Sequence, residues 1–186
     1  MKKNALTSAV TIIFLAMLAC ASPLAVGGPT PEYEPIPVST EAAGALLDKF
    51  DAVSAASGEV TVSITESELT SYLAEQLAAQ PDANFTNPQI YLRDGEMKLY
   101  STVITDNFTA NALVVMKAAV ENGQMTIGLE KADFGPVPVP QGMLASLTSS
   151  INDKLLSLIA KLPAGVSIKA IAIAEGSLTL TAVINP

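Results

Sequence analysis

The chain has 186 residues, with ten basic and eighteen acidic side chains, a net charge of −8, no histidine and one cysteine. This composition excludes Ser–His–Asp triads, Cys–His dyads and zinc sites built on histidine or paired thiolates. The acidic balance, without a basic cluster, argues against binding to nucleic acid and against electrostatic docking onto an anionic membrane. We find no paired-carboxylate motif, phosphate loop or Ser-x-x-Lys motif, so the sequence predicts no enzyme, metal or cofactor.

The N-terminus has the features of an export signal. Lys2 and Lys3 precede an apolar run of ten residues, Ala9 to Leu18. A helix needs about 20 residues to span a bilayer, so this run is too short to do so. A basic start, a short apolar segment and small residues at its end are typical of a signal peptide. We therefore expect residues 1–19 to be removed on export.

Met17-Leu18-Ala19-Cys20 resembles the lipobox of bacterial lipoproteins, in which the cysteine becomes the lipidated first residue of the mature chain. Met17 stands where leucine is usual, and Leu18 where a smaller residue is common. Ala19-Cys20-Ala21 also fits ordinary signal cleavage, which would discard the cysteine. Lipidation is favoured because Cys20 is the only cysteine in the chain and so has no disulfide partner within it. We expect an exported protein of charge −10, anchored to a cell membrane through Cys20 and facing the periplasm or the cell exterior.

The segment after the anchor is rich in proline. Residues 21–40 hold five prolines and two glycines, a composition that predicts an extended tether over residues 20–40. A single folded domain is expected over residues 41–186, with Ser39 or Thr40 as the N-cap of its first helix. We expect Ser57-Gly58 to end that helix. The apolar residues of the helix recur at helical spacing: Leu46, Leu47, Phe50 and Val53.

A strand and two further helices are predicted next. Val60, Val62 and Ile64 alternate with polar residues, as in a half-buried strand. Thr65 and Glu68 form a capping box for the second helix, and Pro81 limits that helix. Its apolar face is formed by Leu69, Tyr72, Leu73 and Leu77. A later helix is indicated by the apolar stripe of Leu144, Leu147, Ile151, Leu155, Leu158 and Leu162.

Three short motifs predict antiparallel hairpins. Asp94-Gly95 and Asn122-Gly123 lie between alternating apolar runs, and type I′ turns need the positive φ angles that these residues tolerate. Glu175-Gly176 is a weaker version of the same signal. The hairpins should span roughly 88–105, 109–134 and 166–184.

Alternation places small apolar side chains on one face of two of these hairpins. In the strand 109–120 that face is wholly apolar and includes Ala112, Val114, Met116 and Ala118. In the last hairpin the same pattern groups Ile168 with Ala170, Ala172 and Ala174. Small side chains on a curved sheet can leave room for a ligand, but they can equally let a helix pack closely, which is the commoner use. We predict that an apolar groove is lined by Ala112, Val114, Met116, Ala118, Leu144, Leu147, Ile151 and Leu155.

The order of these elements resembles the bacterial TULIP-like (tubular lipid-binding) proteins, above all the LmeA-like phospholipid-binding family and the YpmS-like membrane-anchored proteins. The resemblance rests on four stretches: Val62–Leu69, Ile90–Met97, Phe134–Pro140 and Ile173–Leu178. It implies an α+β fold in which a strongly curved antiparallel sheet of hairpins wraps two main helices as a half-barrel. It also implies an apolar groove for lipid chains.

Two functions follow as expectations. The first is an envelope lipoprotein that binds, and carries, a lipid or another apolar ligand without catalysis. The alternative is a structural or protein-interaction lipoprotein with a closed core and no ligand. The sequence identifies neither the ligand nor a protein partner.

Overall fold

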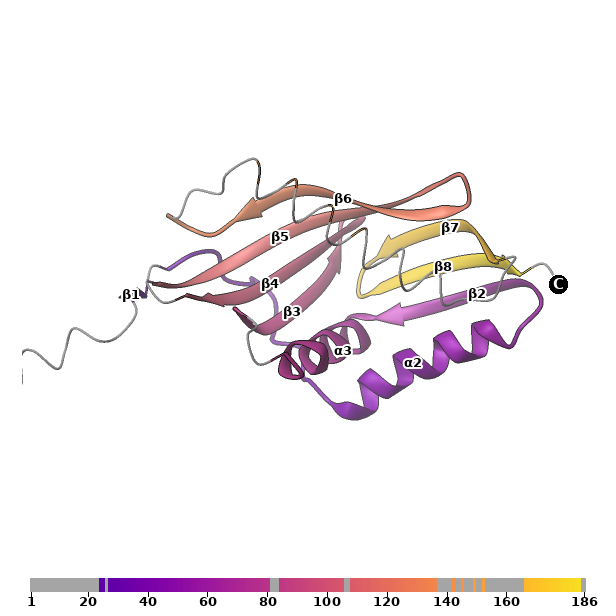
Figure 1. The fold of residues 1–186 in the computed structure, drawn as a ribbon, viewed down its shortest axis with the longest axis horizontal. Helices are drawn as coiled ribbons and strands as arrows, with labels where there is room; N and C mark the ends of the chain where they lie inside the picture. The colour runs from indigo at the N-terminus through magenta and orange to yellow at the C-terminus, as the bar shows by residue number, and fades with distance from the viewer. Residues whose placement is uncertain are drawn as a thin grey trace, which may run out of the picture.

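The protein is described from a computed structural model. The structure describes residues 24–25, 27–80, 84–105, 108–136 and 166–184, together with the single positions 142, 145, 149 and 152. These residues form an α+β fold (Figure 1). Its elements are β1 (Leu24–Ala25), α2 (Thr40–Ser54), β2 (Gly58–Thr65), α3 (Glu66–Ala78), β3 (Phe85–Arg93), β4 (Glu96–Ile104), β5 (Phe108–Glu121), β6 (Gln124–Asp133), β7 (Val166–Ala174) and β8 (Ser177–Ile184).

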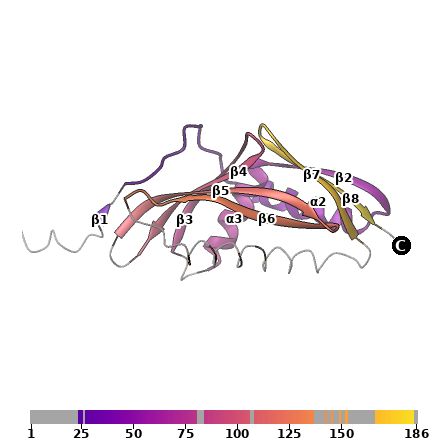
Figure 2. The same cartoon turned by 90° about the horizontal axis from the view of Figure 1, so that it is seen from above.

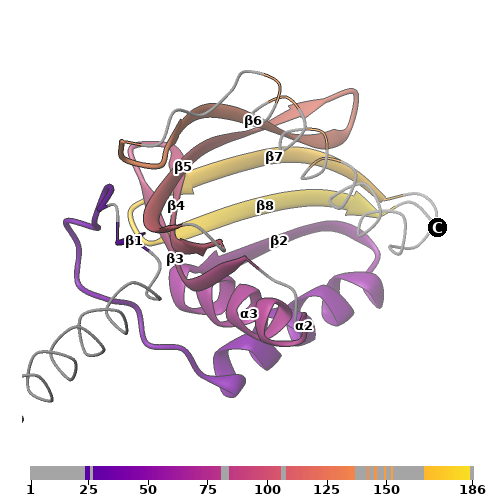
Figure 3. The same ribbon diagram turned by 60° about the vertical axis from the view of Figure 1, so that its left-hand side comes forward.

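The strands form two sheets. In sheet A the order is β1-β5-β4-β3, and β6 also pairs with β5; sheet B has the order β2-β8-β7. The pairs among β2 to β8 are antiparallel, whereas the two-residue β1 runs parallel to β5. Together the sheets make a curved, open wall, with α2 and α3 lying beyond β2 in Figure 3. The predicted α+β half-barrel of hairpins with two helices is thus confirmed.

The three predicted hairpins are β3–β4, β5–β6 and β7–β8. Both central residues of the first two turns have positive φ: 57° and 75° at Asp94-Gly95, and 53° and 79° at Asn122-Gly123. These are the signs of a type I′ turn, whose twist matches that of the strands. In the third turn Gly176 has a φ of 81°, but Glu175 is not among the described residues with positive φ. That difference explains the weaker sequence signal there.

A β-bulge corrects the predicted face of the last hairpin. The register shifts between Ile168 and Ala170, so that Ile171 lies opposite Leu180 while Ala172 lies opposite Thr179. One extra residue inverts the alternation after it. Ile168 therefore shares its face with Ile171, and the alanines of β7 point to the other face, where they are exposed.

Both helices begin at the predicted caps. The Ser39 hydroxyl accepts a hydrogen bond from the amide of Ala42, and Thr65 with Glu68 forms the complete capping box. The predicted apolar stripe of α2 is correct only in part. Leu46 and Val53 are buried, but Leu47 is 48% and Phe50 is 38% exposed.

Polar side chains of α3 cover the free edge of sheet A. The amide of Ile90 in β3 donates to the Thr70 hydroxyl at 3.0 Å, and the amide of Leu92 donates to the Glu66 carboxylate at 2.6 Å. An unpaired edge strand would otherwise invite another strand to pair with it. This use explains why Thr70 is fully buried although it is polar.

The tips of the hairpins join the two sheets. The amide of Gly176, at the tip of β7–β8, donates to the carbonyl of Leu92 at 3.0 Å. The amide of Ile168 donates to the carbonyl of Gly123, at the tip of β5–β6, at 2.9 Å. Figure 2 shows the β5–β6 ribbon running along the molecule until its tip meets sheet B. The sheets are therefore one continuous wall.

The predicted tether is described at residues 24–25 and 27–40, and the part before α2 lies against sheet A. The carbonyl of Gly27 accepts from the amide of Asn111, and the main chain of Ile36 pairs with both polar atoms of the Gln89 side chain. Tyr33 lies between Gly27 and Ile36 in the sequence, and the centroid of its ring is 4.9 Å from that of Tyr91. The segment is extended, but it is bound to the domain from residue 24 onward, because β1 pairs with β5. Its reach as a tether is shortened accordingly.

Candidate functional site

The predicted groove residues of β5 share one buried face of sheet A. Val114 is only 6% exposed, and Ala112 and Met116 are buried with it. They form a cluster with Val103 and Phe134. We call this side of both sheets, against which α2 and α3 pack, the inner face. Ala118, further along β5, continues it and is half-buried.

The predicted groove residues Leu144, Leu147, Ile151 and Leu155 lie outside the described residues, as does Cys20. Four positions of the predicted later helix are described, and each is helical. One of them, Asn152, contacts the sheet directly. Its side-chain amide accepts from the amide of Ile127 at 2.9 Å and donates to the carbonyl of the same residue at 2.8 Å. Because these are main-chain groups of Ile127, which lies opposite Ala118, the contact places position 152 at the free edge of β6, level with Ala118.

The inner face continues without interruption toward the helices. A second cluster, centred on Ile90 and Leu92, joins β3 to α2, β2 and β8. Met97 and Leu99 of β4 pack against both clusters. The apolar surface therefore runs from β6 to sheet B. Several of its side chains are only half-buried: Met97, Leu99, Ile127, Leu129, Ile171 and Ile173.

At sheet B the inner face is closed by α2. The space left there is about 20 Å³, enough for about one water molecule. Its lining is entirely apolar: Phe50, Val53, Val62, Ile64, Val166, Ile168, Leu180 and Ala182. In this structure a lipid chain has no room at this end.

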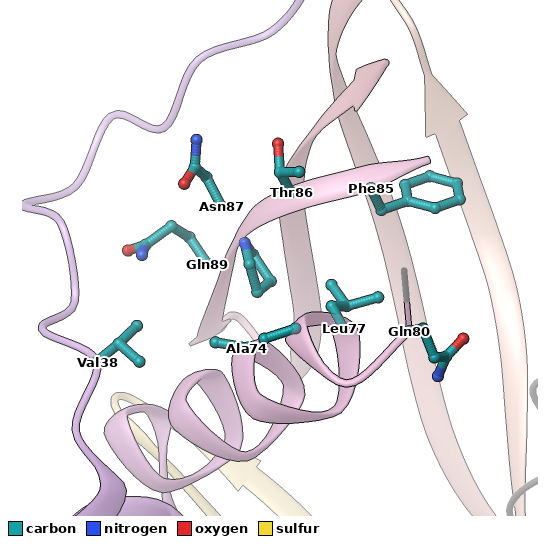
Figure 4. Close-up of a pocket in the computed structure, with 10 residues that line it drawn as sticks. Val38, Ala74, Leu77, Gln80, Phe85, Thr86, Asn87 and Gln89 are labelled. Atoms are coloured by element: carbon teal, nitrogen blue, oxygen red, sulfur yellow. The ribbon is translucent and has the colours of Figure 1, made fainter. Parts of the chain in front are cut away.

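A cleft of about 600 Å³ lies between the second half of α3 and the first half of β3 (Figure 4). Its volume is in the range of small-molecule sites. Leu77 rises from α3 toward β3, with Phe85 on one side and Val38 on the other. The cleft exists because the register of β3 shifts between Thr86 and Gln89, which takes the strand out of regular pairing there. Sequence reasoning missed it, although Asn87-Pro88 within a strand signals such an irregularity.

The lining of this cleft is uncharged. It consists of Val38, Ala74, Leu77, Ala78, Gln80, Phe85, Thr86, Asn87, Pro88 and Gln89. The polar groups are amides and one hydroxyl, and the Gln89 amide is already bound to the main chain of Ile36. Such a lining suits apolar chains and neutral polar groups rather than a free anion.

Partly exposed ion pairs hold elements together away from this cleft. Lys49 of α2 contacts the Glu68 carboxylate of α3 at 2.7 Å. Burial raises the pKa of Glu68, but hydrogen bonds from Lys49 and Thr65 outweigh it, and the pKa lies below the ordinary 4.5. Arg93 pairs with both Glu66 and Glu175, which ties β3 to α3 and to the β7–β8 turn. These contacts are structural.

The described residues bring together no group of three or more His, Cys, Asp or Glu side chains that could hold a metal ion. Among the same residues, no helix combines the length and apolar character needed to cross a bilayer.

Comparison with known proteins identifies the family. The model of the LmeA-like phospholipid-binding family matches residues 32–183, and the chain belongs to this family. The match covers β2 to β8 with both helices, and it is to a lipid-binding family rather than an enzyme family. No curated protein and no solved structure matches the chain significantly. The resemblance to YpmS-like proteins stays a prediction.

Proposed function

We propose that this member of the LmeA-like phospholipid-binding family holds the acyl chains of a phospholipid along its inner face and carries the lipid at the cell envelope. One observation supports this most. Met97 and Leu99 connect both apolar clusters, yet they are half-buried. A continuous apolar wall with partly uncovered side chains offers a surface to an acyl chain.

The energetics suit an apolar ligand. Each methylene that moves from water to an apolar surface gains about 0.8 kcal/mol, so a long acyl chain gains on the order of 10 kcal/mol before ordering costs. The clusters of the inner face consist of aliphatic and aromatic side chains. We therefore expect selectivity for chain length to exceed selectivity for the head group.

The anchor is the second part of the proposal. We propose that Cys20 is the first mature residue and that it carries acyl chains, so that the exported protein faces the periplasm or the cell exterior. One chain alone gives only marginal binding, and stable anchoring needs more than one signal, which a diacylated cysteine provides. Intact-mass analysis of membrane-extracted protein tests this. A mature N-terminus at Ser22, or an unmodified cysteine, would contradict it.

Native mass spectrometry of gently purified protein tests lipid binding. We expect a co-purifying phospholipid, and after delipidation we expect saturable binding of a fluorescent phospholipid. Protein that is folded but binds no lipid in either measurement would end the lipid-carrier proposal.

A second candidate is a structural or protein-interaction lipoprotein with a closed core. The tight burial of Val114 and its neighbours and the 20 Å³ space at sheet B favour it. The two functions differ in whether the half-buried apolar residues of β4 and β6 contact lipid. The binding measurement above separates them.

A further inference from the structure

The strands β3, β4 and β5 of sheet A have no charged residue toward one end of the sheet, although the neighbouring β6 places Asp133 opposite Leu113 and Lys131 opposite Val115. The stretches 84–92, 99–105 and 108–116 contain no Asp, Glu, Lys or Arg. Strand pairing gathers the ends of these stretches, because Phe85 lies opposite Val103 and Ile104 lies opposite Thr109. Asp82 and Asp106 fall outside the described residues. The described ends of these three strands are therefore uncharged, and we call them the uncharged strand ends.

Large apolar side chains are exposed at this end. Ile104 is 41% and Phe85 is 36% exposed. They belong to adjacent strand ends, since the amide of Ile104 donates to the carbonyl of Asn84 at 2.8 Å. The exposed Leu47 belongs to α2 and not to these strands.

The N-terminal strand begins at the same end. Leu24 of β1 pairs with Phe108 at the start of β5, and Figure 1 shows β1 beside the end of β4 and the start of β5. Leu24 is four residues after Cys20. Four extended residues reach at most about 14 Å. An anchor on Cys20 therefore holds this end, rather than sheet B, close to the membrane.

We propose that the uncharged strand ends of sheet A form a membrane-docking surface that rests on a phospholipid bilayer through Phe85 and Ile104. That these strand ends face the membrane rests on the Cys20 anchor of the proposed function. The exposure of Phe85 and Ile104 does not depend on that anchor. An anionic lipid surface repels acidic side chains, and the described ends of β3, β4 and β5 carry none, whereas the exposed Phe85 and Ile104 gain free energy on entering hydrocarbon. Phe85 also lines the cleft of Figure 4, so docking brings that cleft to the bilayer.

The chain contains no tryptophan, so a single introduced tryptophan reports on one position. We choose Ile104→Trp at the proposed surface and Leu47→Trp as the control, because both replace large apolar side chains of similar exposure. Full-length lipidated protein is reconstituted into phosphatidylcholine vesicles with or without bromine on the acyl chains. The emission of Ile104→Trp should shift to the blue and lose most of its intensity in the brominated vesicles. Leu47→Trp should show neither change.

Phe85→Trp provides a second reporter in case Ile104→Trp does not fold. Its tryptophan emission should be quenched by the brominated lipid in the same way. Equal quenching at positions 104 and 47, no quenching at positions 104 and 85 in folded protein, or failure of wild type to float with vesicles would each overturn the proposal. Mass spectrometry of co-purified lipid on the same sample keeps the two ideas separate. Bound lipid with unquenched Ile104→Trp overturns the docking surface alone. Quenched Ile104→Trp without bound lipid supports docking and removes the lipid-carrier function.

Discussion

Val114→Asp places a carboxylate in the middle of the inner face. Val114 lies opposite Leu99 of β4 and Ala132 of β6, and it is 6% exposed. Its cluster consists of apolar side chains, among them Met116 and Phe134. The new carboxylate would thus be buried among groups that cannot pair with it.

The expected cost is a large part of the stability of the domain. A buried charge without a partner costs several kcal/mol, against about 5–15 kcal/mol for the unfolding of a typical domain. At this chain length each kcal/mol lowers the melting temperature by about 2–4 °C, so a cost of about 4 kcal/mol lowers it by roughly 8–16 °C. Burial also raises the pKa of the new carboxyl above its unfolded value of about 3.9. The deficit is therefore full at neutral pH and shrinks as the pH falls toward about 4.

Thermal unfolding followed by circular dichroism measures this effect, with Ala119→Asp as the matched control. Ala119 lies on the same strand, but it is exposed and belongs to the opposite face. The control should stay within about 0.5 kcal/mol of wild type. A melting temperature within about 2 °C of wild type would correspond to a loss of unfolding free energy of less than about 1 kcal/mol at this chain length. That result for Val114→Asp would mean that the inner face is not sealed at β5. A variant that keeps its stability and loses only lipid binding would place the ligand against Val114 itself.

Gly123→Val should destabilise the domain more than Gly95→Val in urea unfolding. Both positions have positive φ, but a Cβ on Gly123 would also lie 2.7 Å from the Ser167 hydroxyl, whereas that on Gly95 meets open space; equal losses would contradict the contact between the sheets. Glu68→Gln should cost about 1–3 kcal/mol at pH 7 through its lost charged hydrogen bonds. Because the folded-state pKa of Glu68 is lowered, the difference from wild type should shrink as the pH falls below about 4.5; a difference that grew in acid would refute this sign. Thr70→Val should leave the amide of Ile90 buried without its acceptor and cost about 1–3 kcal/mol in the same assay, whereas an unchanged midpoint would mean that water replaces the hydroxyl.

Local rules predicted the parts of the fold that depend on neighbouring residues. Asp94-Gly95 and Asn122-Gly123 specify their turns through backbone conformations that few residues adopt. The Thr65–Glu68 capping box satisfies its own helix end. The apolar face of β5 followed from simple alternation, which its pairing with β4 preserves.

Features that depend on distant partners were not predictable in this way. The bulge after Ile168 was missed because alanine fits either face, so the alternation was continued through Ala170, Ala172 and Ala174 instead of shifting to Ile171 and Ile173. Gly28 lies in the segment that was predicted to be an extended tether, but a Cβ there would collide with the carbonyl of Asn111, so glycine permits close approach to the sheet. The cleft beside Phe85 likewise depends on how α3 sits on the edge of β3. Nothing in the sequence of α3 indicated that its polar side chains would contact the edge of β3.

The central claim is that an acyl chain lies along the inner face. A phospholipid with a photoactivatable diazirine on one acyl chain tests it most directly, by cross-linking to delipidated wild-type protein followed by peptide mapping. We expect adducts on β4 and β6, at Leu99, Ile127 or Leu129, whose side chains are half-buried on that face. Adducts confined to the exposed side of α2 at Leu47, or folded protein with no adduct, would contradict the claim.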